Sequence, residues 1–128
     1  MLFKFMKKIL TFFILLISTC SFAAEYKSNF NIEEFKLAQN DGKVVVIHSW
    51  NKFCTTCAKQ KPILEKAKKD FQNIIFMNFE QTSNKDIAKL LKIDYWTTIV
   101  VYKDNKEIAR SIGQTSKSQI YSIIQKGI

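Results

Sequence analysis

The chain has 128 residues and a formal net charge of +9, from 20 Lys and Arg against 11 Asp and Glu. This length is enough for one domain with one hydrophobic core, but not for two. We expect no nucleic-acid partner, because the charge comes from scattered lysines, Arg110 is the only arginine, and no basic-aromatic motif accompanies them.

The N-terminus has the pattern of a secretory signal peptide. Three lysines among the first eight residues precede an apolar run over 9–17 and the small-residue sequence 21–23. We therefore predict a cleaved signal peptide at 1–23, a mature domain at 24–128 and a periplasmic location. An uncleaved membrane anchor is the alternative, although the run is short beside the roughly 20 residues that a span needs.

Cleavage after Ala23 would also remove the first cysteine of the chain. Cys20 could instead be lipidated, which the bulky Thr19 before it disfavours. The mature domain keeps only Cys54 and Cys57, so no disulfide can form outside this pair, even though export indicates an oxidising compartment. The fold must therefore rest on its core.

The predicted domain begins with a helix and a strand. Residues 24–30 carry no more than the signal of a short edge strand. Asn31, with Glu34 three residues later, is typical of a capped helix start, and we expect this helix to end near Gln39. Residues 43–49 predict a strand buried on both faces, because four consecutive residues in it are apolar and β-branched.

The rest of the domain alternates helices with strands. A helix should follow the cysteines to about Asp70, bent at Pro62. Ser83 and Asn84 are candidate caps of a short helix, and Ser116 opens the last one. The remaining strands are expected at 74–79, 98–102 and 108–111, the last two joined by a polar turn. This order predicts an α/β fold with a central mixed β-sheet flanked by helices on both faces.

Cys54 and Cys57 lie three residues apart where a strand gives way to a helix. At a helix N-terminus the unpaired backbone N–H groups stabilise a thiolate, and cysteines at this spacing can close a small disulfide. The pattern therefore indicates dithiol–disulfide exchange. A zinc site would need a second Cys/His pair, which the chain lacks.

The sequence around the cysteines resembles the thioredoxin family. A buried strand leads through Trp50 to Cys54-Thr55-Thr56-Cys57, and Pro62 follows five residues after the second cysteine. The order of elements is similar across nearly all of the domain. The resemblance implies a thioredoxin-like fold and a monomeric thiol-disulfide oxidoreductase that needs no cofactor. Its partners would be protein thiol or disulfide clients and an electron donor, such as a membrane thiol reductase.

Cys54 begins the predicted helix and lies near Lys52 and Lys59, so we predict that it is the attacking thiolate. Cys57 would resolve the mixed disulfide. The two threonines between them do not indicate whether the protein is a reductant or an oxidant. Because the chain lacks a second substrate-binding domain, it is more similar to a reductant or electron carrier for envelope proteins than to a disulfide isomerase.

Two positions depart from the thioredoxin pattern. His48 stands where thioredoxins usually carry a buried acid, and it is either a proton-transfer residue near neutral pH or a neutral core histidine. Thr97 stands where the family has a cis proline. A cis bond before Thr would cost roughly 3 to 4 kcal/mol, so we expect a trans bond and an altered loop. The client-binding residues expected from the family pattern are Trp50, Phe53, Trp96 and Thr97.

Two other functions stay open at this point. Cys54, Cys57 and His48 are soft ligands that a copper-handling thioredoxin-like protein would use. The third possibility is a redox-inert docking domain, which titration of the thiols would reveal.

Overall fold

The computed structural model describes residues 26–128, so the predicted signal peptide at 1–23 lies outside the described residues. The elements in chain order are α2 (Ile32–Asn40), β1 (Val45–Trp50), α3 (Thr55–Asp70), β2 (Ile75–Glu80), α4 (Lys85–Leu90), β3 (Thr98–Lys103), β4 (Lys106–Ile112) and α5 (Lys117–Gln125). This is the predicted order of helices and strands. Within residues 26–128, no helix is both long and apolar enough to cross a membrane.

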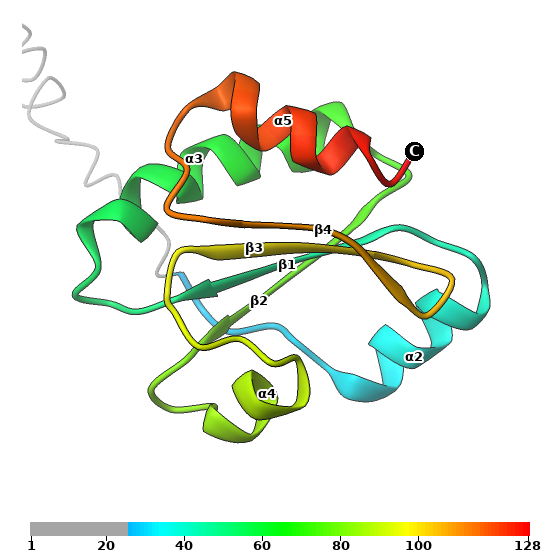
Figure 1. The fold of residues 1–128 in the computed structure, drawn as a ribbon, viewed down its shortest axis with the longest axis horizontal. Helices are drawn as coiled ribbons and strands as arrows, with labels where there is room; N and C mark the ends of the chain where they lie inside the picture. The colour runs from blue at the N-terminus through cyan, green and yellow to red at the C-terminus, as the bar shows by residue number, and fades with distance from the viewer. Residues whose placement is uncertain (1–25) are drawn as a thin grey trace, which may run out of the picture.

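The four strands form one mixed sheet in the order β2-β1-β3-β4. β1 pairs in parallel with β2, whereas β3 is antiparallel to both β1 and β4. Helices α3 and α5 cover one face of the sheet, and α2 and α4 lie against the other (Figure 1). The expected α/β fold, with a mixed sheet between helices, is therefore confirmed.

Strand β1 is buried on both faces, as its continuous apolar run predicts. Val45 and Ile47 join the core cluster that includes Ala38 of α2 and Ala88 of α4. Val46 joins the second cluster, on the face covered by α3 and α5. Successive side chains of a strand point to opposite faces, so an apolar run in a strand at the centre of a three-layer fold supplies both cores. This buried strand leads directly to the cysteine loop.

The predicted capping residues begin all three helices, but only two of them make a side-chain cap hydrogen bond. The Asn31 side chain accepts hydrogen bonds from the backbone N–H groups of Glu33 and Glu34, at 2.9 and 3.0 Å. The Ser116 hydroxyl accepts from the Gln119 N–H at 3.2 Å. Asn84, one of the two candidates for α4, is its N-cap residue, but its side chain makes no cap hydrogen bond and instead donates to the Glu80 carbonyl.

The segment before α2 is not a strand within the described residues, contrary to the prediction for 24–30. It nevertheless follows the outer edge of β2. The N–H groups of Asn29 and Phe30 both donate to the Asn78 carbonyl at 3.0 Å, and the Asn78 N–H donates to the Asn29 side chain at 2.7 Å. The Ser28 hydroxyl accepts from the Glu80 N–H at 2.7 Å. Side-chain oxygens replace part of a strand's backbone hydrogen bonds, so a regular ladder does not form.

The β3–β4 hairpin is tighter than predicted. Asp104 and Asn105 both have positive φ, at 51° and 62°, which is the backbone of a two-residue hairpin turn. β4 therefore begins at Lys106, two residues before the predicted start.

Candidate active site

The two cysteines lie at the start of α3 and are joined by a disulfide. Cys54 is the N-cap residue of the helix, and its sulfur accepts a hydrogen bond from the Cys57 N–H at 3.1 Å. Cys54 is half-buried, whereas Cys57 is only 4% exposed. A thiolate on Cys54 would be stabilised by the helix N-terminus while staying open to attack. This geometry fits the predicted roles of Cys54 as attacking thiol and Cys57 as resolving thiol.

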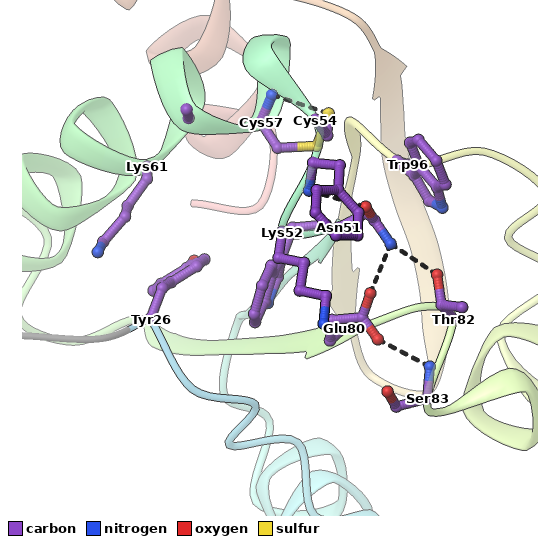
Figure 2. Close-up of a pocket in the computed structure, with 13 residues that line it drawn as sticks. Tyr26, Asn51, Lys52, Cys54, Cys57, Lys61, Glu80, Thr82, Ser83 and Trp96 are labelled. Atoms are coloured by element: carbon purple, nitrogen blue, oxygen red, sulfur yellow. Dashed lines mark hydrogen bonds between the residues drawn. A yellow bond between two sulfur atoms is a disulfide. The ribbon is translucent and has the colours of Figure 1, made fainter.

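Asn51 organises the loop that carries Cys54, and the sequence analysis did not single it out. Its side-chain amide donates to Glu80 Oε1 at 2.7 Å and to Thr82 Oγ1 at 2.6 Å (Figure 2). Its side-chain oxygen accepts from the Phe53 N–H at 2.9 Å, and its carbonyl accepts from the Cys54 N–H at 3.1 Å. A buried polar residue at the end of an apolar strand was the available signal.

Glu80 anchors this loop from the end of β2. Burial alone would raise the pKa of its carboxyl, but hydrogen bonds from Ser83 and Thr82 outweigh that effect and hold the pKa below its usual value. The Ser83 N–H donates to Glu80 Oε2 at 2.7 Å. The carboxylate is therefore charged at neutral pH and fixes both Asn51 and the loop after β2.

An open cavity of about 680 Å³ lies beside the cysteine pair. Figure 2 shows Trp96 and Tyr26 on opposite sides of it, with the cysteines between them in the view. Phe53, 81% exposed, and Trp96, 43% exposed, add apolar surface next to the disulfide. The remaining lining residues are Trp50, Asn51, Lys52, Ala58, Lys61, Glu80, Thr82 and Ser83. Of the four predicted client-binding residues, Thr97 alone is absent from this lining.

His48 is 1% exposed on β1 and is hydrogen-bonded through both ring nitrogens. Nδ1 lies 3.1 Å from the Tyr26 hydroxyl, and Nε2 lies 3.0 Å from the Gln60 side-chain oxygen. Burial lowers the pKa of His48 to about 4, against an opposing effect of the hydrogen bond with Gln60. The imidazole is therefore neutral at pH 7. Its predicted part in proton transfer stays a prediction.

Tyr26 reaches the site from the segment before α2, which the sequence analysis missed. Its ring packs against Trp50 with centroids 5.0 Å apart, and the Lys61 ammonium lies 4.8 Å from its centroid. Burial, reinforced by the carboxylate of Glu65, raises the pKa of the Tyr26 hydroxyl. This hydroxyl therefore stays protonated and can donate to His48.

Thr97 has the trans peptide bond that we expected, since the described residues contain no cis bond. The altered loop takes the form of a left-handed backbone, with φ of 66°. A β-branched residue in this region is a clear outlier and costs on the order of 1 to 3 kcal/mol. The surrounding hydrogen bonds must offset this cost. The Thr97 N–H donates to the Ser49 carbonyl at 2.9 Å.

The copper-binding alternative gains no support from the geometry. Within the described part of the chain, no three His, Cys, Asp or Glu side chains are grouped so that they could hold a metal ion. Cys54, Cys57 and His48 are thus not brought together as a ligand set. A metal would also have to displace one of the two hydrogen bonds of the His48 ring.

Comparison with known proteins identifies the family. A family model described as Thioredoxin matches residues 23–126. The chain belongs to the thioredoxin family. It is 31% identical over 100 residues to the thioredoxin of Coprinus comatus, in an alignment that covers 77% of this chain and 93% of the relative.

Solved thioredoxin-fold structures are similar over most of their length. Trxlp from Edwardsiella tarda superposes with a TM-score of 0.71 at 20% identity, covering 77% of this chain and 98% of that protein. The thioredoxin of Malassezia sympodialis gives 0.66 at 25% identity, covering 77% and 89%. This thioredoxin-family chain is therefore a thiol-disulfide oxidoreductase, with Cys54 and Cys57 as its redox-active pair.

Proposed function

We propose that this thioredoxin-family protein is an exported, monomeric reductant or electron carrier for envelope proteins, supplied with electrons by a membrane thiol reductase. The observation that carries the proposal is the half-buried residue Cys54 beside an open, aromatic-lined cavity, with the buried Cys57 next to it. Apolar surface around an attacking thiol suits a protein client better than a small hydrophilic disulfide. The signal-peptide pattern at 1–23 supports export.

Trp96 supplies a second feature that suits an extended client segment. Within the described residues, its backbone N–H and C=O make no hydrogen bond, while its side chain borders the cavity. An unpaired backbone unit next to a reactive sulfur is a place where a client strand can add its own hydrogen bonds. Phe53 lies at the same cavity and offers the client an apolar contact.

The reaction proceeds in two exchanges. The Cys54 thiolate attacks one sulfur of the client disulfide, so a Cys54–client bond forms and the other client sulfur leaves as a thiolate. Cys57 loses its proton and attacks Cys54, which closes the disulfide seen in this structure and releases the second client thiol. Two electrons pass to the client, and the electron donor returns the pair to the dithiol.

The redox state of the pair in cells tests the direction. Thiol trapping in intact cells would be combined with the reduction potential measured against glutathione. A reductant should have mostly free thiols and a potential near about −270 mV. A pair held as the disulfide, with a much higher potential, would instead identify an oxidant and contradict the proposal.

Export needs its own experiment. The protein would be expressed at natural levels, the cells fractionated, and its N-terminus determined by mass spectrometry. Cleavage after Ala23 and recovery in the periplasmic fraction are expected. Recovery of the uncleaved chain with the membrane would instead support the anchor.

A further inference from the structure

Gln60 is a buried polar residue in the apolar face of α3, one turn after Cys57. Helix α3 buries Cys57, Gln60, Leu64 and Ala67, and Gln60 has 0% exposure. A fully buried amide needs partners for its oxygen and for both of its N–H groups. All three are satisfied, each by a different segment of the chain.

The two hydrogen bonds of the amide nitrogen fix which way the group points. Nε2 donates to the carbonyl of Thr97 at 3.0 Å and to that of Gln114 at 2.9 Å. A carbonyl only accepts, so the nitrogen must face these two groups and Oε1 must face His48. His48 therefore donates from Nε2 and accepts the Tyr26 hydroxyl at Nδ1. The result is one directed chain of hydrogen bonds from Tyr26 to the Thr97 loop.

The far end of this chain is the strained peptide at Thr97. Its carbonyl accepts from Gln60 and also from the Gly113 N–H at 3.1 Å, while its N–H donates to Ser49. The left-handed threonine is thus tied to α3, to β1 and to the segment before α5. Strained backbone persists where its surroundings over-determine it. The Gln60 bond joins this loop to the helix that carries the cysteines.

We propose that Gln60 is a positioning residue that holds the Thr97 loop, and with it Trp96, in register with the cysteine pair for a protein client. The inference rests on the proposed function only in assuming that the clients are proteins. Trp96 immediately precedes the clamped residue and borders the cavity beside Cys54. A loop released from α3 would move Trp96 relative to the sulfur, whereas the Cys57 N–H that donates to the Cys54 sulfur at the helix start would stay in place.

The chain offers a matched control at the other end of the sheet. Gln39 is also buried, at 2% exposure, and its amide hydrogen-bonds the carbonyl of Lys43 and the N–H of Asn105. Gln39→Met and Gln60→Met each remove a buried amide of the same size. Only the second removes a bond to the Thr97 loop.

The experiment compares a protein disulfide with a small one. Wild type, Gln60→Met and Gln39→Met would be assayed with dithiothreitol as electron source and either insulin or hydroxyethyl disulfide as acceptor. For Gln60→Met, kcat/KM for insulin should fall at least about tenfold, mainly through KM, because small displacements at a reaction site are costly. Its rate with hydroxyethyl disulfide should change less than about twofold. Gln39→Met should leave both rates unchanged.

Equal losses on both acceptors for Gln60→Met, or no loss on either, would overturn the positioning role. Failure of wild type itself to reduce insulin while it reduces hydroxyethyl disulfide would overturn the protein-client function, and the inference with it. If Gln60→Met does not fold, hydrogen exchange of the Gln60 side chain in the wild-type protein, followed by NMR, tests the clamp instead. The side-chain NH₂ protons of Gln60 should then exchange as slowly as those of Gln39, and rapid exchange would contradict the clamp.

Discussion

The sulfur of Cys54 lies 3.1 Å from the backbone N–H of Cys57, which donates a hydrogen bond to it at the first turn of α3. The helix N-terminus thus directs a donor at the sulfur that must carry negative charge in the dithiol form. Cys57 provides this donor from its backbone while its own sulfur is buried. One residue therefore activates the nucleophile and later displaces the client.

Single cysteine variants should separate the two roles. In Cys57→Ser, the first exchange leaves a mixed disulfide that no second thiol resolves, so client adducts should accumulate. In Cys54→Ser, the remaining thiol is 4% exposed and should form few adducts. Non-reducing gels followed by mass spectrometry would measure both, with the double variant as control. Equal trapping by the two single variants would reject the assignment.

The free energy of unfolding should decrease as pH falls from 6.5 to about 4, because the buried His48 ring resists protonation in the folded protein. The folded pKa is about 4 and the usual value is 6.5, so the unfolded chain takes up a proton first as pH falls below 6.5. The contribution of the neutral ring to the free energy of unfolding is complete above pH 6.5. Roughly 3 kcal/mol of it is lost between pH 6.5 and about pH 4.

Urea unfolding of wild type and His48→Asn from pH 7.5 to 4.5 would measure this loss. Asn cannot titrate here, so the variant should show a much flatter profile. Asp70 and Glu80 have lowered pKa values, and their contributions are lost only at lower pH, as their folded forms become protonated. Parallel profiles for the two proteins would show that His48 does not carry the effect. Exchange rates measured over the same range would test its predicted part in proton transfer.

Glycine and proline should have opposite effects at Thr97. Thr97→Gly removes the left-handed penalty, and we expect a gain of up to about 1 kcal/mol after the entropy cost of glycine. Thr97→Pro fixes φ near −65° and removes the N–H that donates to Ser49, so a loss on the order of 3 kcal/mol is expected.

Thr115→Gly is the matched control for the glycine substitution. Thr115 is exposed and lacks a positive φ, so glycine there should cost about 0.5 to 1 kcal/mol. Chemical denaturation of the three variants beside wild type gives the comparison. The same loss for both glycine variants would mean that the Thr97 backbone is not strained in solution.

Gly127 should tolerate no side chain. A Cβ atom at this position would lie 2.7 Å from Val44 Cγ1 and 2.9 Å from Val101 Cγ1, closer than real Cβ contacts. Gly127→Ala should therefore destabilise the protein by about 1 to 3 kcal/mol through overpacking. Ser122→Ala is the control, because Ser122 is exposed on α5. Its expected change in the free energy of unfolding is below about 0.5 kcal/mol. A neutral Gly127→Ala would show that the C-terminus moves aside.

Local patterns predicted the helices, the strands and the cysteine motif because each depends on residues a few positions apart. Asn31 and Ser116 cap their helices through neighbours two or three residues away. The partners of Gln60 are 12, 37 and 54 positions distant, and those of His48 include Tyr26, 22 positions before it. No periodic pattern in the sequence predicts hydrogen bonds between residues so far apart in the chain.

A weaker signal was nevertheless present in α3. A glutamine stands on the face where Leu64 and Ala67 are apolar, and a polar residue in that position must find partners inside the protein. Asn51, at the end of the apolar β1, is a similar case. The pattern identifies such residues as unusual. It does not identify the loops that they hold.

The segment 26–30 affects whether copies of the protein associate through the edges of their sheets. The sheet ends at β2 and β4, and a free strand edge is a template for pairing with a second chain. Along β4, Lys106, Glu107 and Arg110 place charges that oppose such pairing. Along β2, Ser28 and Asn29 occupy the backbone groups that a foreign strand would use. A chain shortened to begin at Asn31 should therefore self-associate through β2 and aggregate at concentrations where the longer chain stays dispersed.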